Sequence, residues 1–137
     1  MKAKCIRQIF CNVSAECIFV KEGEIIDYTV ENDAVIIDNV KMRRALFFYH
    51  FKAIDSEEKM NYSDFEYILC NSIFTSAVLF PNEYNGVRHL VIQDWSRSIL
   101  LTINKEETII RVSFENGQEI YSTYEEAIDG IVNHNYE

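Results

Sequence analysis

The stretch from Val87 to Ser122 limits the possible folds most, because it alternates apolar runs with short polar breaks. The runs are rich in Ile, Val, Leu, Thr and Phe, which suit a pleated sheet, and the breaks carry Asp, Asn, Gly and charged residues. The pair Asn116-Gly117 favours a hairpin, since both residues tolerate the positive φ of a primed turn. We expect an antiparallel meander of four strands, over Val87–Gln93, Ser98–Asn104, Thr108–Glu115 and Glu119–Ser122.

The first forty residues show the same kind of pattern. Short β-branched and aromatic runs predict four further strands, over Lys4–Cys11, Glu16–Lys21, Glu24–Glu31 and Ala34–Val40. Asn32 and Asp33 are expected to form the turn between the last two.

Between these halves, the spacing of apolar residues changes. Val40, Arg44, Phe47, Phe51 and Ile54 recur at steps of three and four, which predicts a helix over residues 40–54 that is capped by Asp38 or Asn39. Because residues 46–51 are apolar almost all round, a buried strand is the alternative there.

Two capping boxes indicate further helix starts. Ser63 and Glu66 are expected to satisfy each other's backbone donors at the start of a helix that Pro81 ends. Thr123 and Glu126 predict a short C-terminal helix in the same way.

The fold class that follows is α+β. We expect about eight short, mostly antiparallel strands, two central helices and a short C-terminal helix, in a single domain over residues 1–137. A length of 137 residues and a hydrophobic content of 48% suit one filled core. Whether the strands form one sheet or two stays open.

Cysteine usage and hydropathy indicate a cytoplasmic protein. No apolar run reaches the ~18 residues of a transmembrane helix, and Arg7, Gln8 and Asn12 interrupt the apolar core that a signal peptide needs. We therefore expect the thiols to be reduced, buried and structural, and these are the thiols of Cys5, Cys11, Cys17 and Cys70. Redox or metal-binding roles are the alternative.

Net negative charge is concentrated in the second half, because Lys and Arg are scarce there. Residues 1–59 carry nine Lys/Arg and ten Asp/Glu, a net charge of −1, whereas residues 60–137 carry four and twelve, a net charge of −8. No Lys or Arg follows Arg111. An acidic surface repels nucleic acid and anionic membranes and attracts basic proteins, although acidity of this size also serves solubility alone.

Motifs for catalysis are missing from the sequence. It contains no G-x-S-x-G, no Walker-type loop and no G-x-G-x-x-G, and its three histidines (His50, His89 and His134) lack metal-like spacing. We expect no catalytic site, no metal and no cofactor. A Cys–His pair built from Cys70 with His50 or His89 is the remaining enzymatic alternative.

Two charged regions have structural explanations. Residues 55–66 are acidic but lack the ligand order of a calcium loop, so a solvated loop and a helix cap are expected. Lys41, Arg43 and Arg44 are the only dense basic cluster, which gives little support for nucleic-acid binding. Arg44 lies on the predicted buried stripe and is expected to pair with a carboxylate.

The residues expected to bind a partner fall into two groups. Tyr84, Trp95 and Arg97 are of the types that dominate interface hot spots, although Trp95 could instead fold over the sheet edge. The second group is acidic and consists of Glu115, Glu119, Glu125, Glu126 and Asp129. Two of these, Glu125 and Glu126, also suit the first turn of a helix.

These features favour a small, acidic, non-enzymatic binding protein that inhibits or neutralises a basic macromolecular target. Immunity proteins against toxins and phage-encoded inhibitors of nucleic-acid-handling defence enzymes are of this class, by analogy alone. The expected partner is a basic or nucleic-acid-binding protein, without direct contact to nucleic acid or membrane, and homodimerisation stays open. A module that sequesters a nucleotide or small molecule, with Arg88, Arg97 or Arg111 holding phosphate, is the second hypothesis. An enzyme with a site of scattered Cys, His and carboxylate side chains is the third.

Overall fold

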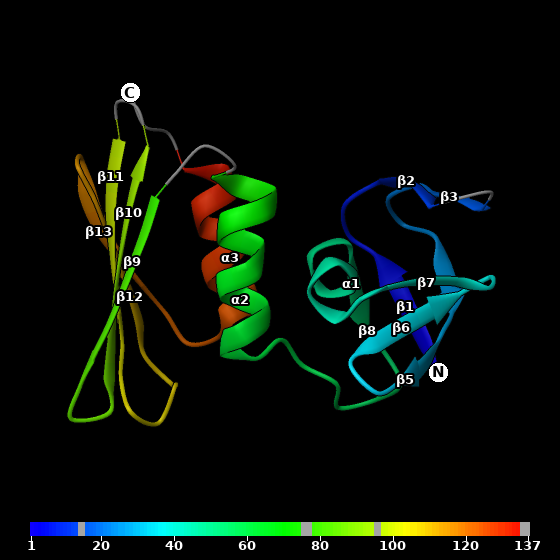
Figure 1. The fold of residues 1–137 in the computed structure, drawn as a ribbon, viewed down its shortest axis with the longest axis horizontal. Helices are drawn as coiled ribbons and strands as arrows, with labels where there is room; N and C mark the ends of the chain where they lie inside the picture. Colours follow the sequence, from blue (N-terminus) through cyan, green and yellow to red (C-terminus); the bar gives the residue numbers. More distant parts are fainter. Residues whose placement is uncertain (14–15, 75–77, 95–96, 135–137) are drawn as a thin grey trace. The chain divides into compact units, whose positions relative to one another are not determined.

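A computed structural model describes residues 1–13, 16–74, 78–94 and 97–134 of the chain (Figure 1). The chain divides into two compact units, Met1–Asp64 and Phe65–Glu137. Each unit has its own antiparallel sheets and its own buried apolar residues. The single domain expected over residues 1–137 stays a prediction.

The fold class is α+β, as the sequence predicts. All strand pairs in the described residues are antiparallel. These residues contain thirteen strands in four sheets, rather than about eight strands in one or two sheets. The number is higher because several predicted runs bend and divide into two shorter strands. Glu24–Glu31, for example, divides at Tyr28.

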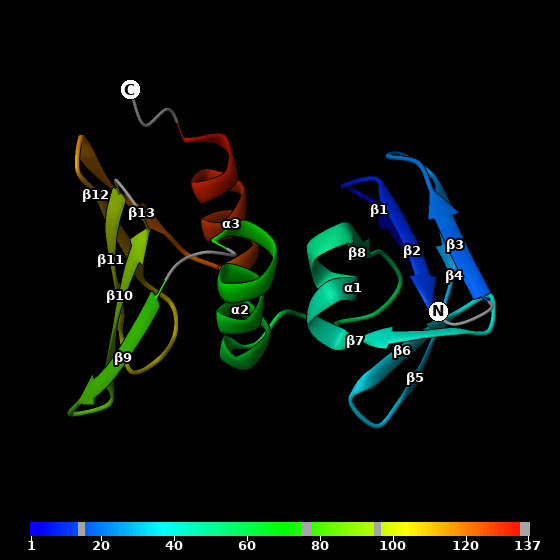
Figure 2. The ribbon, with the colours of Figure 1, turned by 45° about the horizontal axis from the view of Figure 1, so that its top comes forward.

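The first unit contains three small sheets and the helix α1 (Arg44–His50) (Figure 2). Its strands are β1 (Lys2–Cys5), β2 (Ile9–Val13), β3 (Glu16–Val20), β4 (Ile25–Asp27), β5 (Thr29–Glu31), β6 (Ala34–Ile37), β7 (Val40–Arg43) and β8 (Phe51–Ala53). β1 lies between β4 and β8, β2 pairs with β3, and β5, β6 and β7 form a meander. Phe47 lies at the centre of its aromatic core, with ring centroids 4.7 Å from Tyr28 and 5.3 Å from Phe51.

The helix predicted over residues 40–54 is right only for α1. Residues 40–43 form β7, in which Val40 and Met42 are buried and the two basic residues between and after them are exposed. Asp38 and Asn39, which were expected to cap a helix, instead have φ values of 49° and 68° and form the turn between β6 and β7. This turn pairs residues 40–43 with β6, and the pairing overrides their helical spacing.

The second unit contains one five-stranded sheet in the order β13-β12-β11-β10-β9. Its strands are β9 (Val78–Tyr84), β10 (Val87–Asp94), β11 (Arg97–Ile103), β12 (Ile110–Phe114) and β13 (Gly117–Tyr121). The predicted four-stranded meander is therefore confirmed, and β9 extends it by one strand.

The central helix ends earlier than predicted. It consists of α2 (Tyr62–Ile68) and the π-helical segment η1 (Leu69–Ile73), so Pro81 does not end it. Pro81 lies instead within β9, opposite Leu90. β9 is an edge strand, where a residue without a backbone N–H is tolerated.

The core of the second unit lies on one face of its sheet. α2, η1 and α3 (Tyr124–Asn133) cover this face (Figure 1), and the rings of Phe65 and Tyr124 lie 4.9 Å apart. The buried sheet residues alternate along each strand and include Leu90, Ile92, Ile99, Leu101, Ile103, Ile110 and Val112. From α3, the buried residues are Tyr124, Ala127, Ile128 and Ile131.

Candidate functional site: the acidic edge of the second unit

The position of α3 against the β12–β13 hairpin defines the site. Thr123 caps the helix as predicted, since its Oγ1 accepts a hydrogen bond from the backbone N–H of Glu126 at 3.1 Å. At the other end of α3, the His134 ring stacks on Phe114 at 3.6 Å and its Nε2 lies 2.7 Å from Oδ1 of Asn116. The helix is therefore capped at its start and attached to the β12–β13 hairpin at its end.

The five predicted carboxylates all lie on this hairpin and helix, and we call them the acidic edge: Glu115, Glu119, Glu125, Glu126 and Asp129. Glu115 is in the β12–β13 turn, Glu119 is on β13, and the others are on α3. Four of the five are exposed, and Glu125 is half-buried. The hairpin turn, β13 and α3 contain no Lys or Arg, so the structure gathers negative charge here without local neutralisation by a basic residue of these elements.

Three members of the acidic edge are oriented by hydrogen bonds. Glu115 accepts from the backbone N–H of Ser98 at 3.2 Å, and Glu126 accepts from that of Ser122 at 3.3 Å. Glu119 accepts from the Tyr121 hydroxyl at 2.5 Å. A carboxylate has two oxygens and about four lone-pair sites, so each group keeps acceptor capacity for a cationic partner.

Tyr84, one of the predicted aromatic anchors, does not lie at this edge. Tyr84 is 71% exposed but lies on β9, the opposite edge strand. Four strand spacings separate β9 from β13, which amounts to about 19 Å. Trp95 and the side chain of Arg97 lie outside the described residues, although the backbone of Arg97 pairs with Asp94.

The arginines that were considered as phosphate ligands differ in their surroundings. Nη1 of Arg88 lies 3.1 Å from Glu107, which also accepts a hydrogen bond from the Tyr124 hydroxyl at 2.5 Å. Burial and the Glu107 carboxylate raise the pKa of Tyr124, which keeps this hydroxyl protonated as a donor. Arg88 therefore belongs to a structural cluster, whereas Arg111 is exposed.

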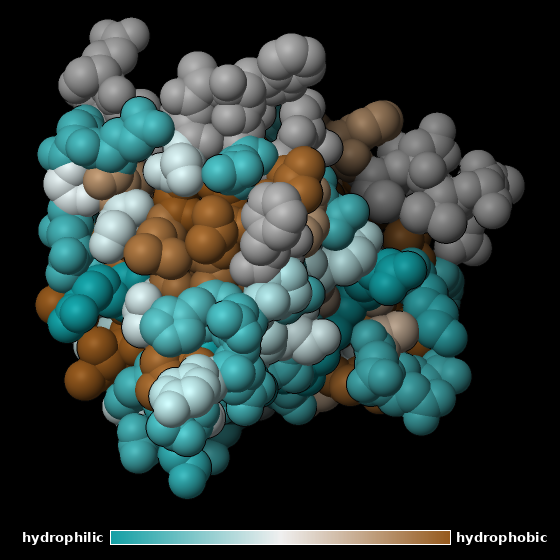
Figure 3. All heavy atoms as spheres, turned by 60° about the vertical axis from the view of Figure 1, so that its left-hand side comes forward, coloured by the Kyte–Doolittle hydropathy of each residue, from teal (hydrophilic) through white to brown (hydrophobic). Residues whose placement is uncertain are grey.

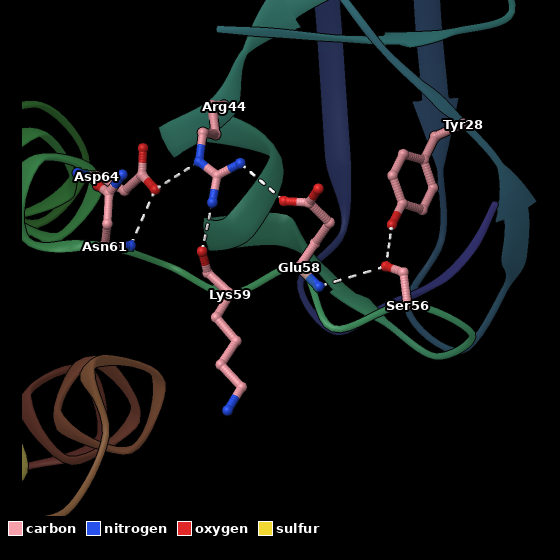
Figure 4. Close-up of polar contacts among 7 residues, drawn as sticks. All are labelled: Tyr28, Arg44, Ser56, Glu58, Lys59, Asn61 and Asp64. Carbon is pink, nitrogen blue, oxygen red and sulfur yellow. Dashed lines mark hydrogen bonds and ion pairs between the residues drawn. The ribbon is translucent and has the colours of Figure 1, made fainter.

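Arg44 pairs with carboxylates, as the sequence predicts (Figure 4). Its Nε lies 3.0 Å from Asp64 and its Nη1 lies 2.9 Å from Glu58, while Nη2 donates to the backbone carbonyl of Lys59 at 2.5 Å. The guanidinium also lies over the Phe48 ring, 4.7 Å from its centroid. Arg44 thereby ties the segment that leaves the first unit to α1.

The acidic segment around residue 64 ends in a helix cap, but the cap is not the predicted one. The Asn61 Oδ1 accepts from the Asp64 N–H at 2.8 Å, and the Asp64 Oδ2 accepts from the Asn61 N–H at 3.1 Å (Figure 4). This reciprocal pair starts α2 two residues earlier than a box of Ser63 with Glu66 would.

The described thiols have the surroundings of structural residues. Cys5 is fully buried, its Sγ donates to the Arg7 carbonyl at 3.2 Å, and burial raises its pKa. Burial likewise raises the pKa of Cys70 and lowers that of His50. Because the thiolate is the reactive form, raised thiol pKa values disfavour nucleophilic chemistry. The side chains of Cys11 and Cys17 lie outside the described residues.

Neither a metal-binding cluster nor a membrane-spanning helix is found in the part of the chain that the structure describes. No group of three or more His, Cys, Asp or Glu side chains there is arranged to hold a metal ion. No helix in that part of the chain is both long and apolar enough to cross a membrane.

No protein-family model, curated protein or solved structure matches this chain.

Proposed function

We propose that this chain is a small, non-enzymatic, cytoplasmic binding protein whose acidic edge docks on a basic macromolecular target and inhibits or neutralises it. The target that suits this surface is a basic protein, including one that itself binds nucleic acid, because its cationic patch would complement the acidic edge.

The observation that carries the proposal is the gathering of five carboxylates on the β12–β13 turn, β13 and α3, which contain no Lys or Arg. The excess of negative charge is specific to the second unit, because each unit has eleven Asp and Glu but the second has only four Lys and Arg, against nine in the first. The first unit has a net charge of −2 and the second a net charge of −7.

The burial of the Cys5 thiol and the raised pKa values of Cys5 and Cys70 support a non-enzymatic role, as does the engagement of Arg88 by Glu107. In the described residues, we find no assembled Cys–His site and no assembled phosphate-binding site that would support the two alternative hypotheses.

The test begins with affinity purification of the partner from the native host, using the full chain as bait. Rate constants are then measured for the purified partner with the wild type and with a triple variant, Glu115→Gln, Glu119→Gln and Glu126→Gln. Glutamine keeps an acceptor oxygen for Ser98, Tyr121 and Ser122 but removes the charge. At ~0.1 M salt we expect association to slow about tenfold, and the difference should fade toward 1 M as the Debye length falls from about 10 Å to about 3 Å.

The matched control changes three exposed carboxylates of the first unit: Glu22→Gln, Glu31→Gln and Glu57→Gln. Both triple variants change the net charge from −9 to −6. The control should associate at nearly the wild-type rate, and the edge variant should also lose inhibition of the partner's own activity. Equal slowing by both triples would mean that only net charge matters, and a wild-type rate for the edge triple would remove the acidic edge from the binding surface.

A further inference from the structure

The face of the five-stranded sheet that α2 and α3 leave uncovered has an unusual composition, and we call it the open face. The strand register assigns to it the residues that alternate with the buried ones. In the described side chains these are Val78, Asn82, Tyr84, Val87, His89, Val91, Gln93, Ser98, Leu100, Thr102, Arg111, Ser113, Gln118 and Ile120. Figure 3 shows hydrophobic side chains gathered at the centre of this side of the molecule, with hydrophilic ones around them.

Charge is nearly missing from the open face. The second unit has eleven Asp and Glu, yet none stands at an open-face position of the described strands, and Arg111 is the one Lys or Arg there among the described side chains. Apolar side chains remain exposed on it, including Leu100 at 42% on the central strand and Ile120 at 58% on the edge strand. Exposed apolar clusters bordered by polar residues typically mark interaction sites.

We infer that the open face is the docking surface for a second copy of this chain, with the two sheets packed face to face. This inference is independent of the acidic edge, which lies on the hairpin turn, β13 and α3.

The charge distribution selects the second copy over another partner. A chain with a net charge of −9 repels its own copies over most of its surface. The open-face strand positions carry no carboxylate, and Glu115 stands only at the end of the face, beside Ser98, so this is the part of the second unit where self-association costs least in repulsion. A charged partner, in contrast, would find no complement there except Arg111.

The size of the face sets the expected strength. Five strands at ~4.8 Å and seven residues at ~3.3 Å make a face of about 24 by 23 Å, or roughly 550 Å². Stable interfaces bury about 800 Å² on each partner, so the dimer should be weak, with a Kd on the order of 100 µM.

Salt dependence distinguishes this contact from binding at the acidic edge. Two acidic copies meet through a surface whose strand positions carry no carboxylate and so offer Arg111 no acidic partner, and screening therefore removes repulsion without removing attraction. Self-association should therefore tighten about threefold or more between ~0.05 M and ~0.5 M NaCl, whereas binding of a basic target should weaken.

The experiment is sedimentation equilibrium of the full chain from about 5 to 500 µM, a range that brackets the expected Kd, at both salt concentrations. Leu100→Glu places a carboxylate at the centre of the face and should weaken the dimer at least tenfold. Ile25→Glu is the matched control, because Ile25 is 59% exposed on β4 of the first unit. It should dimerise like the wild type.

Ile120→Glu, nearer the rim of the face, should weaken the dimer less than Leu100→Glu and serves if the Leu100 variant fails to fold. A wild type that stays monomeric up to ~500 µM in both salts would overturn the proposal, given the expected Kd. Equal dimerisation of the open-face variants and Ile25→Glu would place the contact elsewhere. If the wild type is monomeric but Leu100→Glu loses an isolated partner, the face belongs to that partner.

Discussion

At the residue scale, a few asparagines and glycines decide which hairpins form tight primed turns. Asn85 and Gly86 join β9 to β10 with φ values of 53° and 81°, as a type I′ turn requires. The pair Asn116-Gly117 has the same sequence, but neither residue has a positive φ. Gly117 instead pairs with Phe114, so the loop of that hairpin is Glu115-Asn116.

This difference predicts that two glycine substitutions change the free energy of unfolding by different amounts. Gly86→Ala should lower the free energy of unfolding by about 1–2 kcal/mol, because an L-residue is strained in the left-handed region. Its Cβ would also lie 2.9 Å from Cγ of Lys105. Gly117→Ala is the control, because its Cβ would meet no atom within 4 Å, and its effect should stay within about 0.5 kcal/mol. Urea unfolding of both variants measures this, and equal losses would contradict the turn assignment.

A second residue-scale prediction concerns the cap of α2. Asn61→Ala removes the acceptor for the Asp64 N–H and should cost about 0.5–2 kcal/mol of the free energy of unfolding. Ser63→Ala should change it by less than about 0.5 kcal/mol, since Ser63 lies inside the helix rather than at its cap. Chemical denaturation separates the two, and a larger loss at Ser63 would restore the helix start expected from its capping box.

At the element scale, α3 and β13 pack closely against each other where Gly130 of the helix meets Tyr121 of the strand. A Cβ at this position would overlap the Tyr121 ring and hydroxyl, so the absence of a side chain lets that ring lie against the helix. The same hydroxyl donates to Glu119 of the acidic edge. The glycine therefore helps to fix a carboxylate of the candidate site.

This contact predicts a reversal of the usual glycine effect. In most helices Gly→Ala stabilises by about 1 kcal/mol, but Gly130→Ala should destabilise, because Tyr121 must move. In a Tyr121→Ala background, Gly130→Ala should raise the free energy of unfolding, as this substitution does in most helices. A double-mutant cycle by thermal or urea unfolding measures the coupling, and additive effects of the two substitutions would mean that the ring does not lie on Gly130.

The elements also show what sequence could and could not predict. The meander strands can be predicted from period-two alternation between clear turn signals. The acidic edge can be predicted because its members lie close together in the sequence, along one hairpin and the helix that follows it. β9 does not follow from the sequence, because Pro81 after an apolar helical stripe predicts a helix stop rather than an edge strand. Residues 40–43 satisfy both a helical and a strand pattern, and only pairing with β6 decides between them.

The distance between Tyr84 and the acidic edge could not be read from the sequence either. It depends on strand order, which places β9 and β13 at opposite edges of one sheet. The residues of the open face could be predicted from the sequence in principle, since strand alternation alone separates them from the buried ones.

At the scale of the whole molecule, charge and surface chemistry are divided between the units. The second unit combines a net charge of −7 with an open face that has no carboxylate. Its repulsion is therefore concentrated on the remaining surface, including the acidic edge. Such self-repulsion opposes the compact state and is reduced by salt.

The melting temperature of the chain should accordingly rise between ~0.02 M and ~0.3 M NaCl, where screening is the main effect of salt. The slope of this rise should be smaller for the edge triple variant (Glu115→Gln, Glu119→Gln, Glu126→Gln) than for the control triple in the first unit, although both have a net charge of −6. The slope is the informative quantity, because a lost charge-assisted hydrogen bond shifts the melting temperature by a similar amount at every salt concentration. Differential scanning calorimetry of the three proteins measures it. Equal slopes for both triple variants would show that the carboxylates of the acidic edge repel one another no more than those of the first unit. The acidic edge would then not be a region of concentrated negative charge.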